Sequence, residues 1–319
     1  MGEAPDIQVD DQIAALISGQ KRYNHEAMNT TFQIIFPPEF EKTKVENICA
    51  ACFQLVDSLE QLLSKFIPNS DVSRIVDLDA NEEEMVSFET LDLLNIAQEM
   101  YHKTEGCFDL TMSELMLLWL DDHKQLKKPP PELVAAAKVR SGLDKLVILE
   151  DDIAVKVLVD QLQLDFGAIG KGYAVDQMVA MLQEYGIDCA LVHGGFSTFY
   201  GFGQPADFVG WPLSFSHPKT NKLLGKVTLQ NEAFSASGLT EGFHIIDPRK
   251  GEPVKSRVAS WAIAKNATES DALSTTFMIM DKTDIETYCK QAPAATAVVL
   301  EKNKDEPHQL GDSTAIELV

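Results

Sequence analysis

A glycine-rich segment contains the first residues whose types and spacing could do chemistry. Residues 164–176 read LDFGAIGKGYAVD, with Gly167 and Gly170 before Lys171. Where such a loop leads from a strand into a helix, backbone N–H groups approach a phosphate at the positive helix end, and lysine adds a charge. A Walker A motif is excluded, because Asp165 lies where its first glycine belongs. A tight turn with an exposed lysine explains the pattern equally well.

A histidine and a carboxylate lie three residues apart in the segment 244–251, HIIDPRKG. An imidazole titrates near neutral pH, so His244 is a candidate general base, with Asp247 and Arg249 close by in the sequence. Spacing alone favours a simpler interpretation, an apolar strand entering a turn that begins with Asp, continues with Pro and closes with Gly.

Asp271 and Thr275 are an oxygen-bearing pair in the segment 270–276, SDALSTT. Residues four apart lie on the same side of a helix. A carboxylate and a hydroxyl on one face suit Mg²⁺, which takes oxygen ligands and keeps several waters. The alternative is a capping box, Thr268-x-x-Asp271, at the start of an apolar helix, and the pattern alone slightly favours it.

The elements that must position these residues follow from hydrophobic periodicity. Helices are predicted at 43–66, 85–102, 113–120 and 173–184, and others begin at the PPPEL run and near Ser270. Strands are predicted at TTFQIIF, LVIL, AVKVLV, LQLDF, CALVH, SRVASWAIA and ATAVVL, the last closing the core. The first 27 residues are predicted to form a helix or arm, and Glu82–Glu84 to start a helix. Helices and strands do not alternate regularly, which favours an α+β fold.

Two weaker signals carry no function. Cys49 and Cys52 have the CxxC spacing, but they lie on the apolar stripe of the helix at 43–66 and are predicted to be small buried thiols. Gly201-Phe-Gly-Gln-Pro-Ala matches a dinucleotide fingerprint on paper, yet no helix pattern follows it.

Charge and composition exclude several classes of partner. The 319 residues include 27 Lys and Arg against 49 Asp and Glu, for a net charge of −22. Such a surface repels nucleic acid and anionic lipid at long range. The sequence contains no run of about 18 apolar residues, so no membrane-spanning helix is predicted. The acidic N-terminus lacks an apolar signal core, so a cytoplasmic location is expected, an exported form with its leader removed being the alternative.

The order of the motifs is more specific than any one of them. Along the chain come MNTT, NSDVSRI, GCFDLT, LDFGAIGKGYAVD, ALVHGG, SASG, HIIDPRKGEPV and SDALSTT. This series resembles the ApbE-type FAD:protein FMN transferases from Met28 to the C-terminus. The resemblance implies an α+β, T-fold-related single domain over 28–319, with mixed antiparallel sheets and packed helices, after an N-terminal arm over 1–27.

The resemblance also implies Mg²⁺-dependent transfer of FMN from FAD to a Thr or Ser hydroxyl of an unknown acceptor flavoprotein, with release of AMP. An FAD diphosphatase and a catalytically impaired FAD-binding protein are the alternatives. Matched motif by motif, the resemblance implies metal ligands at Asp271, Thr275 and the carbonyl of Ala168, and a catalytic His244 with Asp247 shaping its pocket. It implies FAD-contacting residues at Lys171, Asp109, Thr111, Gly167, Gly170, Gly195 and Ser237.

Several positions depart from the family pattern. His193 takes the place of the usual Leu before the Gly-Gly pair, and Phe196 that of the Asn or Asp after it. Lys250 replaces Thr in the DPRTG turn, and only residues 239–243 separate SASG from HIIDP, where the family commonly has a longer segment beside the nucleotide.

Overall fold

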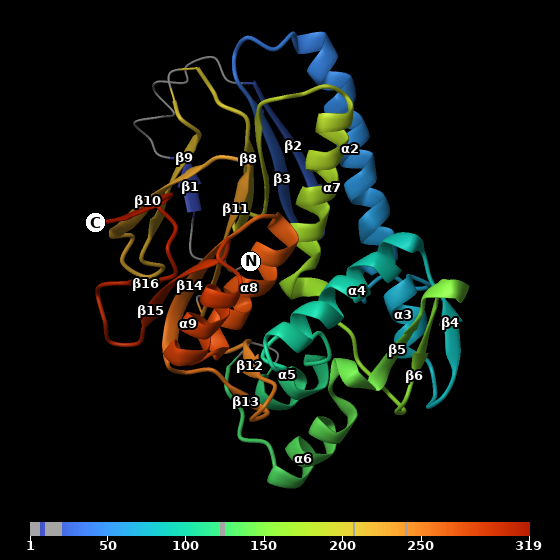
Figure 1. Ribbon diagram of the computed structural model, residues 1–319. Helices are drawn as coiled ribbons and strands as arrows, with labels where there is room; N and C mark the ends of the chain where they lie inside the picture. The colour runs from blue at the N-terminus through green and yellow to red at the C-terminus, as the bar shows by residue number, and fades with distance from the viewer. Residues whose placement is uncertain (1–6, 10–20, 122–124, 207, 240–241) are drawn as a thin grey trace. The chain divides into compact units, whose positions relative to one another are not determined.

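The computed structural model describes residues 7–9, 21–121, 125–206, 208–239 and 242–319 (Figure 1). The chain divides into two compact units. Unit 1 comprises residues 1–57, 171–240 and 256–319, and unit 2 comprises 58–170 and 241–255. Each unit is therefore assembled from segments that are far apart in the sequence, and each is described by itself.

An eight-stranded sheet forms the framework of unit 1, and every neighbouring pair in it is antiparallel. Its strands lie in the order β16 (His308–Leu310), β15 (Thr296–Glu301), β14 (Arg257–Ala264), β11 (Glu232–Gly238), β8 (Thr198–Phe202), β7 (Ala190–Gly194), β3 (Thr30–Phe36) and β2 (Lys21–Ala27). Successive side chains of a strand point to opposite faces, so each strand serves two layers.

One face of this sheet packs against a second, four-stranded sheet. The second sheet has the order β1 (Ile7–Val9), β9 (Trp211–Ser216), β10 (Leu223–Leu229) and β17 (Ile316–Leu318). Phe199 and Trp261 from the large sheet share a buried apolar cluster with Trp211 and Phe215 from the small one. The rings of Phe215 and Trp261 lie 4.9 Å apart. This aromatic cluster forms part of the apolar core of unit 1.

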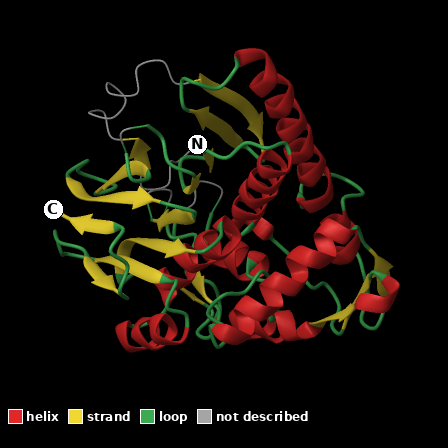
Figure 2. Ribbon diagram, turned by 45° about the horizontal axis from the view of Figure 1, so that its top comes forward, coloured by secondary structure: helices red, strands yellow, loops and turns green. Residues whose placement is uncertain are grey.

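Helices pack on the large sheet as well (Figure 2). Helix α8 (Ala267–Ile279) contacts β11 and β14, and α9 (Lys282–Gln291) contacts β15 and β16. Helices α2 (Lys42–Leu63) and α7 (Gly170–Glu184) run side by side, with Cys52 Sγ 3.9 Å from the carbonyl oxygen of Met178. Because most residues of α8 are buried, its polar side chains must find partners on the neighbouring strands and helices.

Unit 2 combines short helices with a three-stranded sheet in the order β4 (Glu83–Met85), β6 (Ala154–Val157) and β5 (Leu146–Leu149). A hairpin of β12 (Ile246–Asp247) and β13 (Glu252–Pro253) packs on a small apolar cluster that includes Leu115, Ala137 and Ile246. The remaining elements of unit 2 are α3 (Asp71–Val76), α4 (Phe88–Lys103), α5 (Ser113–Trp119), α6 (Pro131–Arg140) and the 3₁₀ turns η1 (Leu143–Lys145), η2 (Glu150–Asp152) and η3 (Phe166–Ala168).

Most elements predicted from periodicity are present, and the α+β class is confirmed. All five cysteines are buried, and burial raises the pKa of the Cys52 thiol to about 12, which confirms the interpretation of the CxxC pair. The expected helix or arm is wrong for Lys21–Ala27, which forms edge strand β2. The rest of that arm, apart from β1, lies outside the described residues.

Three other predictions are wrong. Residues 162–166 form no strand. Leu162 and Leu164 are buried, but they belong to a loop that turns at Asp165 and continues into η3. The acidic run 82–84 leads into strand β4 and not into a helix. Strand β15 does not close the core, because β16 pairs beyond it. Helix α8 begins at Ala267, near the expected Ser270.

Candidate functional site

The carboxylate of Asp271 is a buried acidic group of unit 1. It is 3% exposed. Its Oδ2 accepts from the backbone N–H of Gly172 at 3.0 Å and lies 3.4 Å from Nζ of Lys171. Its Oδ1 accepts from the Thr198 hydroxyl at 3.0 Å. A carboxylate at the start of α7 is favoured by the positive helix end, so α7, β8 and α8 together fix the orientation of this group.

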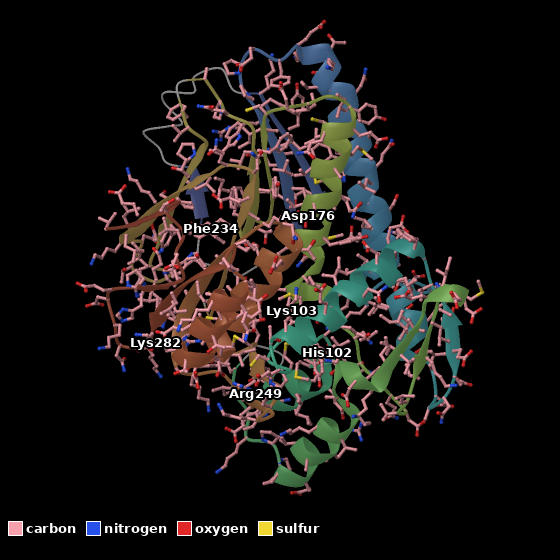
Figure 3. All side chains as sticks on the ribbon, in the orientation of Figure 1. His102, Lys103, Asp176, Phe234, Arg249 and Lys282 are labelled. Carbon is pink, nitrogen blue, oxygen red and sulfur yellow. The ribbon has the colours of Figure 1, made fainter. Side chains whose placement is uncertain are left out.

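The capping-box interpretation of Asp271 is wrong. The N-cap of α8 is Asn266, whose side chain accepts from the N–H of Glu269. The carboxylate of Asp176, on α7 (Figure 3), accepts from the N–H groups of Ala267 and Thr268 at 2.8 Å each. The N–H groups of the first helical turn are thus bonded without Asp271, whose carboxylate is directed at α7 and β8 instead.

Close approach of α7 to α8 depends on Gly172. A Cβ atom at this position would lie 2.2 Å from the carbonyl oxygen of Ala267 and 2.8 Å from Cβ of Asp271. No side chain fits at such distances, so glycine is required here by packing and not by backbone conformation. The same approach brings the Gly172 N–H within hydrogen-bond distance of Asp271.

A cluster of hydroxyl groups continues along α8 from Asp271. Oγ of Ser237, on β11, lies 2.8 Å from Oγ of Ser274 and 3.0 Å from Oγ1 of Thr275. Ser274 also donates to the backbone carbonyl of Asp271 at 2.8 Å. Asp271 and Thr275 lie one turn apart on the helix, as the spacing predicted. Hydroxyl oxygens of β8, β11 and α8 lie beside them, while α7 contributes the Gly172 N–H and Nζ of Lys171.

These donors fit a magnesium ion better than a metal that prefers nitrogen or sulfur. Within the described ranges, no group of three or more His, Cys, Asp or Glu side chains could hold a metal. Mg²⁺ typically uses one or two carboxylates and completes its shell with water and substrate phosphates. One carboxylate with a neighbouring hydroxyl meets that requirement, and each oxygen of Asp271 retains lone-pair capacity beyond the hydrogen bonds described.

In unit 2, Asp109 and Thr111 form a compact turn. Oδ1 of Asp109 accepts from the N–H and the hydroxyl of Thr111 at 2.8 and 2.7 Å, and Thr111 Oγ1 accepts from Gly142 at 2.6 Å. Burial is the main cause that raises the pKa of Asp109 to about 6, and the charge of Asp144 adds to it. Asp109 can therefore change protonation state close to neutral pH.

His244 precedes β12 in unit 2. Its Nδ1 lies 3.2 Å from the carbonyl oxygen of Gly242, an acceptor that favours the tautomer protonated at Nδ1. The neutral ring then carries its basic lone pair on Nε2, as a general base requires. Asp247 is 4% exposed, accepts from the N–H of Arg249 at 3.0 Å and pairs with Nζ of Lys250 at 2.9 Å. The Asp247 carboxylate thus stabilises the hairpin turn.

The glycine loop differs in part from the expected phosphate cradle. Asp165 accepts from the Gly167 N–H at 2.9 Å and pairs with Lys65 at 2.6 Å, so the Gly167 N–H is already bonded. Ala168 ends η3, and Gly170 begins α7. In unit 1, Gly195 has φ +66° in the turn after β7, and a Cβ there would lie 2.6 Å from Oγ1 of Thr30. Its glycine is therefore explained by the turn.

A surface cavity of about 320 Å³ lies in unit 2 beside the Lys65–Asp165 pair. Phe66, 85% exposed, and Ser113 are among its lining residues, and Nζ of Lys65 lies 5.2 Å from the centroid of the Phe66 ring. Sequence reasoning missed this cavity, and it missed Thr198, Ser274 and the capping role of Asp176. No sequence pattern marks these three residues, because each contacts a residue of another element or another turn.

Comparison with known proteins identifies the family of this chain. The sequence matches the ApbE family over residues 28–300. An FAD:protein FMN transferase of Escherichia coli K12 is 26% identical over 241 residues, covering 70% of this chain and 68% of the relative. A relative of the same name from Klebsiella pneumoniae strain 342 is 24% identical over 280 residues, covering 83% of this chain and 80% of its own.

Solved structures agree in fold. The flavin transferase ApbE of Vibrio cholerae superposes with a TM-score of 0.79 at 22% identity, over 92% of this chain and 98% of that one. The ApbE protein of Thermotoga maritima gives a TM-score of 0.79 at 23% identity, over 91% and 96%. The α+β fold of this chain is therefore shared with these two structures. The chain belongs to the ApbE family. Among the described residues, no helix has the length and apolar character to cross a bilayer.

Proposed function

We propose that this protein transfers FMN from FAD to a Thr or Ser hydroxyl of an acceptor protein, in a Mg²⁺-dependent reaction that releases AMP. The observation that carries the proposal is the environment of Asp271. Its carboxylate is held by Gly172 and Thr198, and the Thr275 hydroxyl follows one turn later. Phosphoryl transfer depends on positioning and charge neutralisation, which such a group provides once it binds a cation.

Asp271 and Thr275, one helical turn apart on α8, are the proposed metal ligands within unit 1. When bound, Mg²⁺ supplies charge neutralisation to the diphosphate of FAD. Lys171, whose side chain is partly buried, adds a fixed positive charge near Asp271. The family names of the relatives, FAD:protein FMN transferase, support FAD as the substrate and a protein as the acceptor.

His244 is the proposed base. The acceptor hydroxyl oxygen attacks the phosphorus of the FMN half, its proton passes to Nε2 of His244, and the bond to the AMP phosphate breaks. The Nδ1 contact with Gly242 leaves Nε2 as the basic atom. The cavity beside Phe66 has the volume for one planar ring system, and an exposed aromatic side chain can stack on it.

The test is a transfer assay with a defined acceptor. Purified protein is mixed with FAD, Mg²⁺ and a Thr-containing acceptor peptide, and both AMP and peptide-bound flavin fluorescence are measured. Both products should form together and both should disappear in excess chelator. AMP without labelled peptide would identify an FAD diphosphatase, and full activity in chelator would contradict the metal site.

Two variants test the proposed ligands. Asp271→Asn removes the formal charge and Thr275→Val removes the hydroxyl while nearly preserving shape, so both should reduce Mg²⁺-dependent AMP release severely. Glu286→Gln, on the exposed side of α9, removes the same charge as the first variant and should change nothing. Earlier melting with normal activity at saturating FAD and Mg²⁺ would mean that the metal lies elsewhere.

A further inference from the structure

Six exposed cations gather around hairpin β12–β13 and α6 of unit 2. We call them the basic face; Arg249, labelled in Figure 3, is one of them. Among the described residues of the same segments, the exposed carboxylates are Asp121, Glu132 and Glu252. In a chain with a net charge of −22, this surface has the opposite sign. The members of the basic face are Lys127, Lys128, Lys138, Arg249, Lys250 and Lys255.

Direct contacts fix the hairpin against α6. Nζ of Lys138 donates to the carbonyl oxygen of Arg249 at 2.7 Å. Gly251, at φ +70°, approaches the helix so closely that a Cβ would lie 2.7 Å from Cδ of Lys138. The cations of the hairpin and of α6 therefore keep a constant spacing.

Trp119 contacts the hairpin and also the segments that carry Lys127 and Lys255. Its Nε1 donates to the carbonyl oxygen of Gly251 at 2.7 Å, and its carbonyl oxygen accepts from the N–H of Lys127, also at 2.7 Å. Nζ of Lys255 lies 5.9 Å from the centroid of its ring. A half-buried indole thus lies among the lysines and supplies apolar contact area beside their charges.

The basic face is continuous with the proposed base. The N–H of Val254 donates to the carbonyl of Ile245 at 2.9 Å across the two arms of the hairpin. His244 and Lys255 are the next residues of those arms, outward from the turn. A polypeptide whose hydroxyl reached His244 would therefore meet the hairpin and its cations.

We infer that the basic face docks an acidic segment of the acceptor protein and so brings its Thr or Ser toward His244. The inference rests on the proposed function, because that function requires an acceptor protein. The binding that the inference requires can nevertheless be measured without transfer. Charge complementarity favours a short acidic segment, which meets the local cations. Long polyanions such as nucleic acid or an anionic membrane also meet the repulsive field of the whole chain.

The test uses three synthetic peptides of equal length, each with one central Thr flanked by Asp and Glu, by Asn and Gln, or by Lys. Fluorescence anisotropy measures their affinities, and single-stranded DNA and phosphatidylserine vesicles are tested alongside. The protein variant combines Lys127→Gln, Lys128→Gln and Lys138→Gln. The control variant combines Lys44→Gln, Lys219→Gln and Lys290→Gln, which remove the same charge from unit 1. Melting curves confirm that both are folded.

The acidic peptide should bind best, and the variant should bind it about tenfold more weakly, as expected for the loss of three exposed charge contacts. The control should resemble the native protein. The difference should shrink from about 0.1 M to about 1 M salt, where the screening length falls from about 10 Å to about 3 Å. FAD affinity in the absence of peptide should be unchanged in the variant.

Three results would overturn the docking inference: equal affinity for the acidic and neutral peptides, equal losses in variant and control, or tighter binding of DNA or vesicles than of the acidic peptide. Absence of FMN transfer with selective binding of the acidic peptide would instead contradict the proposed function alone.

Discussion

The Asp271 carboxylate of unit 1 is held by partners far away in the sequence, whereas the Asp109 and Asp247 carboxylates of unit 2 accept hydrogen bonds from neighbours in their own turns. Asp271 accepts from Gly172 and Thr198, which are 99 and 73 residues away in the sequence. Asp109 accepts from Thr111, two residues away. Contacts of the first kind exist only when the whole unit is folded, while those of the second kind need only a local turn.

The difference predicts two kinds of response to substitution. In unit 1, geometry and stability depend on the same packed contacts, so a change there should affect both. In unit 2, His244 contacts Gly242 and Asp247 contacts Arg249, again two residues away. Changes at such turns should alter proton transfer or charge with little loss of global stability.

The largest effect is expected for His244→Ala. Loss of a general base should slow transfer by about 10²–10⁴-fold, while the midpoint of thermal unfolding changes little, because the side chain belongs to a local turn. Single-turnover transfer and FAD affinity are measured separately. His102→Ala, an exposed histidine of α4 (Figure 3), is the control. Lost FAD affinity with an intact single-turnover rate would make His244 a binding residue.

Gly172→Ala should show the opposite behaviour, losing stability and activity together. The added Cβ would lie 2.2 Å from a backbone oxygen of α8, so the helices must separate, at a cost of about 3 kcal/mol in unfolding free energy. Gly170→Ala is the control, because its Cβ would meet only Phe166 at 3.5 Å. Urea unfolding compares the two, and equal stabilities would show that the contact of α7 with α8 is adaptable.

Asp109→Asn should change how stability depends on pH. The pKa of Asp109 is raised from 3.8 to about 6, so its contribution to stability is present below about pH 4 and is lost as pH rises through 6. The variant should lack this loss and gain about 2 kcal/mol relative to the native protein between pH 4 and 8. Urea midpoints across this range measure it.

Asp71→Asn should change the pH dependence of stability in the opposite direction. Hydrogen bonds from Ser87, Thr90 and Arg74 outweigh burial and lower the pKa of Asp71. The stability it provides is present above its unfolded pKa and is lost at acid pH, so this variant should be weaker at neutral pH. If the stabilities of the two variants, relative to the native protein, changed with pH in the same direction, the expected opposite pH dependence would be contradicted.

The smallest effect is expected for His193→Leu in unit 1. His193 is 1% exposed between the rings of Phe196 and Phe199, and its Nδ1 has no hydrogen-bond partner within the described ranges. Leucine removes that unsatisfied atom and should raise the unfolding free energy by about 1 kcal/mol.

Acid should enlarge this gain. Burial lowers the pKa of His193 to about 3, so the native protein loses stability as pH falls below about 6.5, and the leucine variant should not. His193→Ala, which leaves a cavity, should be less stable than the native protein. A leucine variant no more stable than the native protein at any pH would show that the histidine is accommodated without cost.

Local chemistry was readable from the sequence wherever it depends on periodicity. The spacing of Asp271 and Thr275 predicted one helix face, and the spacing of Cys49 and Cys52 predicted buried thiols; both are present. Alternating polar side chains concealed β2, because only pairing with β3 makes Lys21–Ala27 a strand. The loop at 162–166 has the apolar content of a strand, but hydrogen bonding of Asp165 to Leu110 and Gly167 forms a turn instead.

By itself the sequence determined the residue types, their helical or strand spacing and the order of the motifs, because these depend on neighbours along the chain. The tertiary structure decided what those residues do. Asp176 of α7 accepts hydrogen bonds from the first N–H groups of α8, so Asp271 does not cap this helix. The Asp271 carboxylate instead accepts from Gly172 and Thr198. Burial likewise raised the pKa of Asp109 to about 6, since desolvation depends on the surrounding fold and not on sequence neighbours.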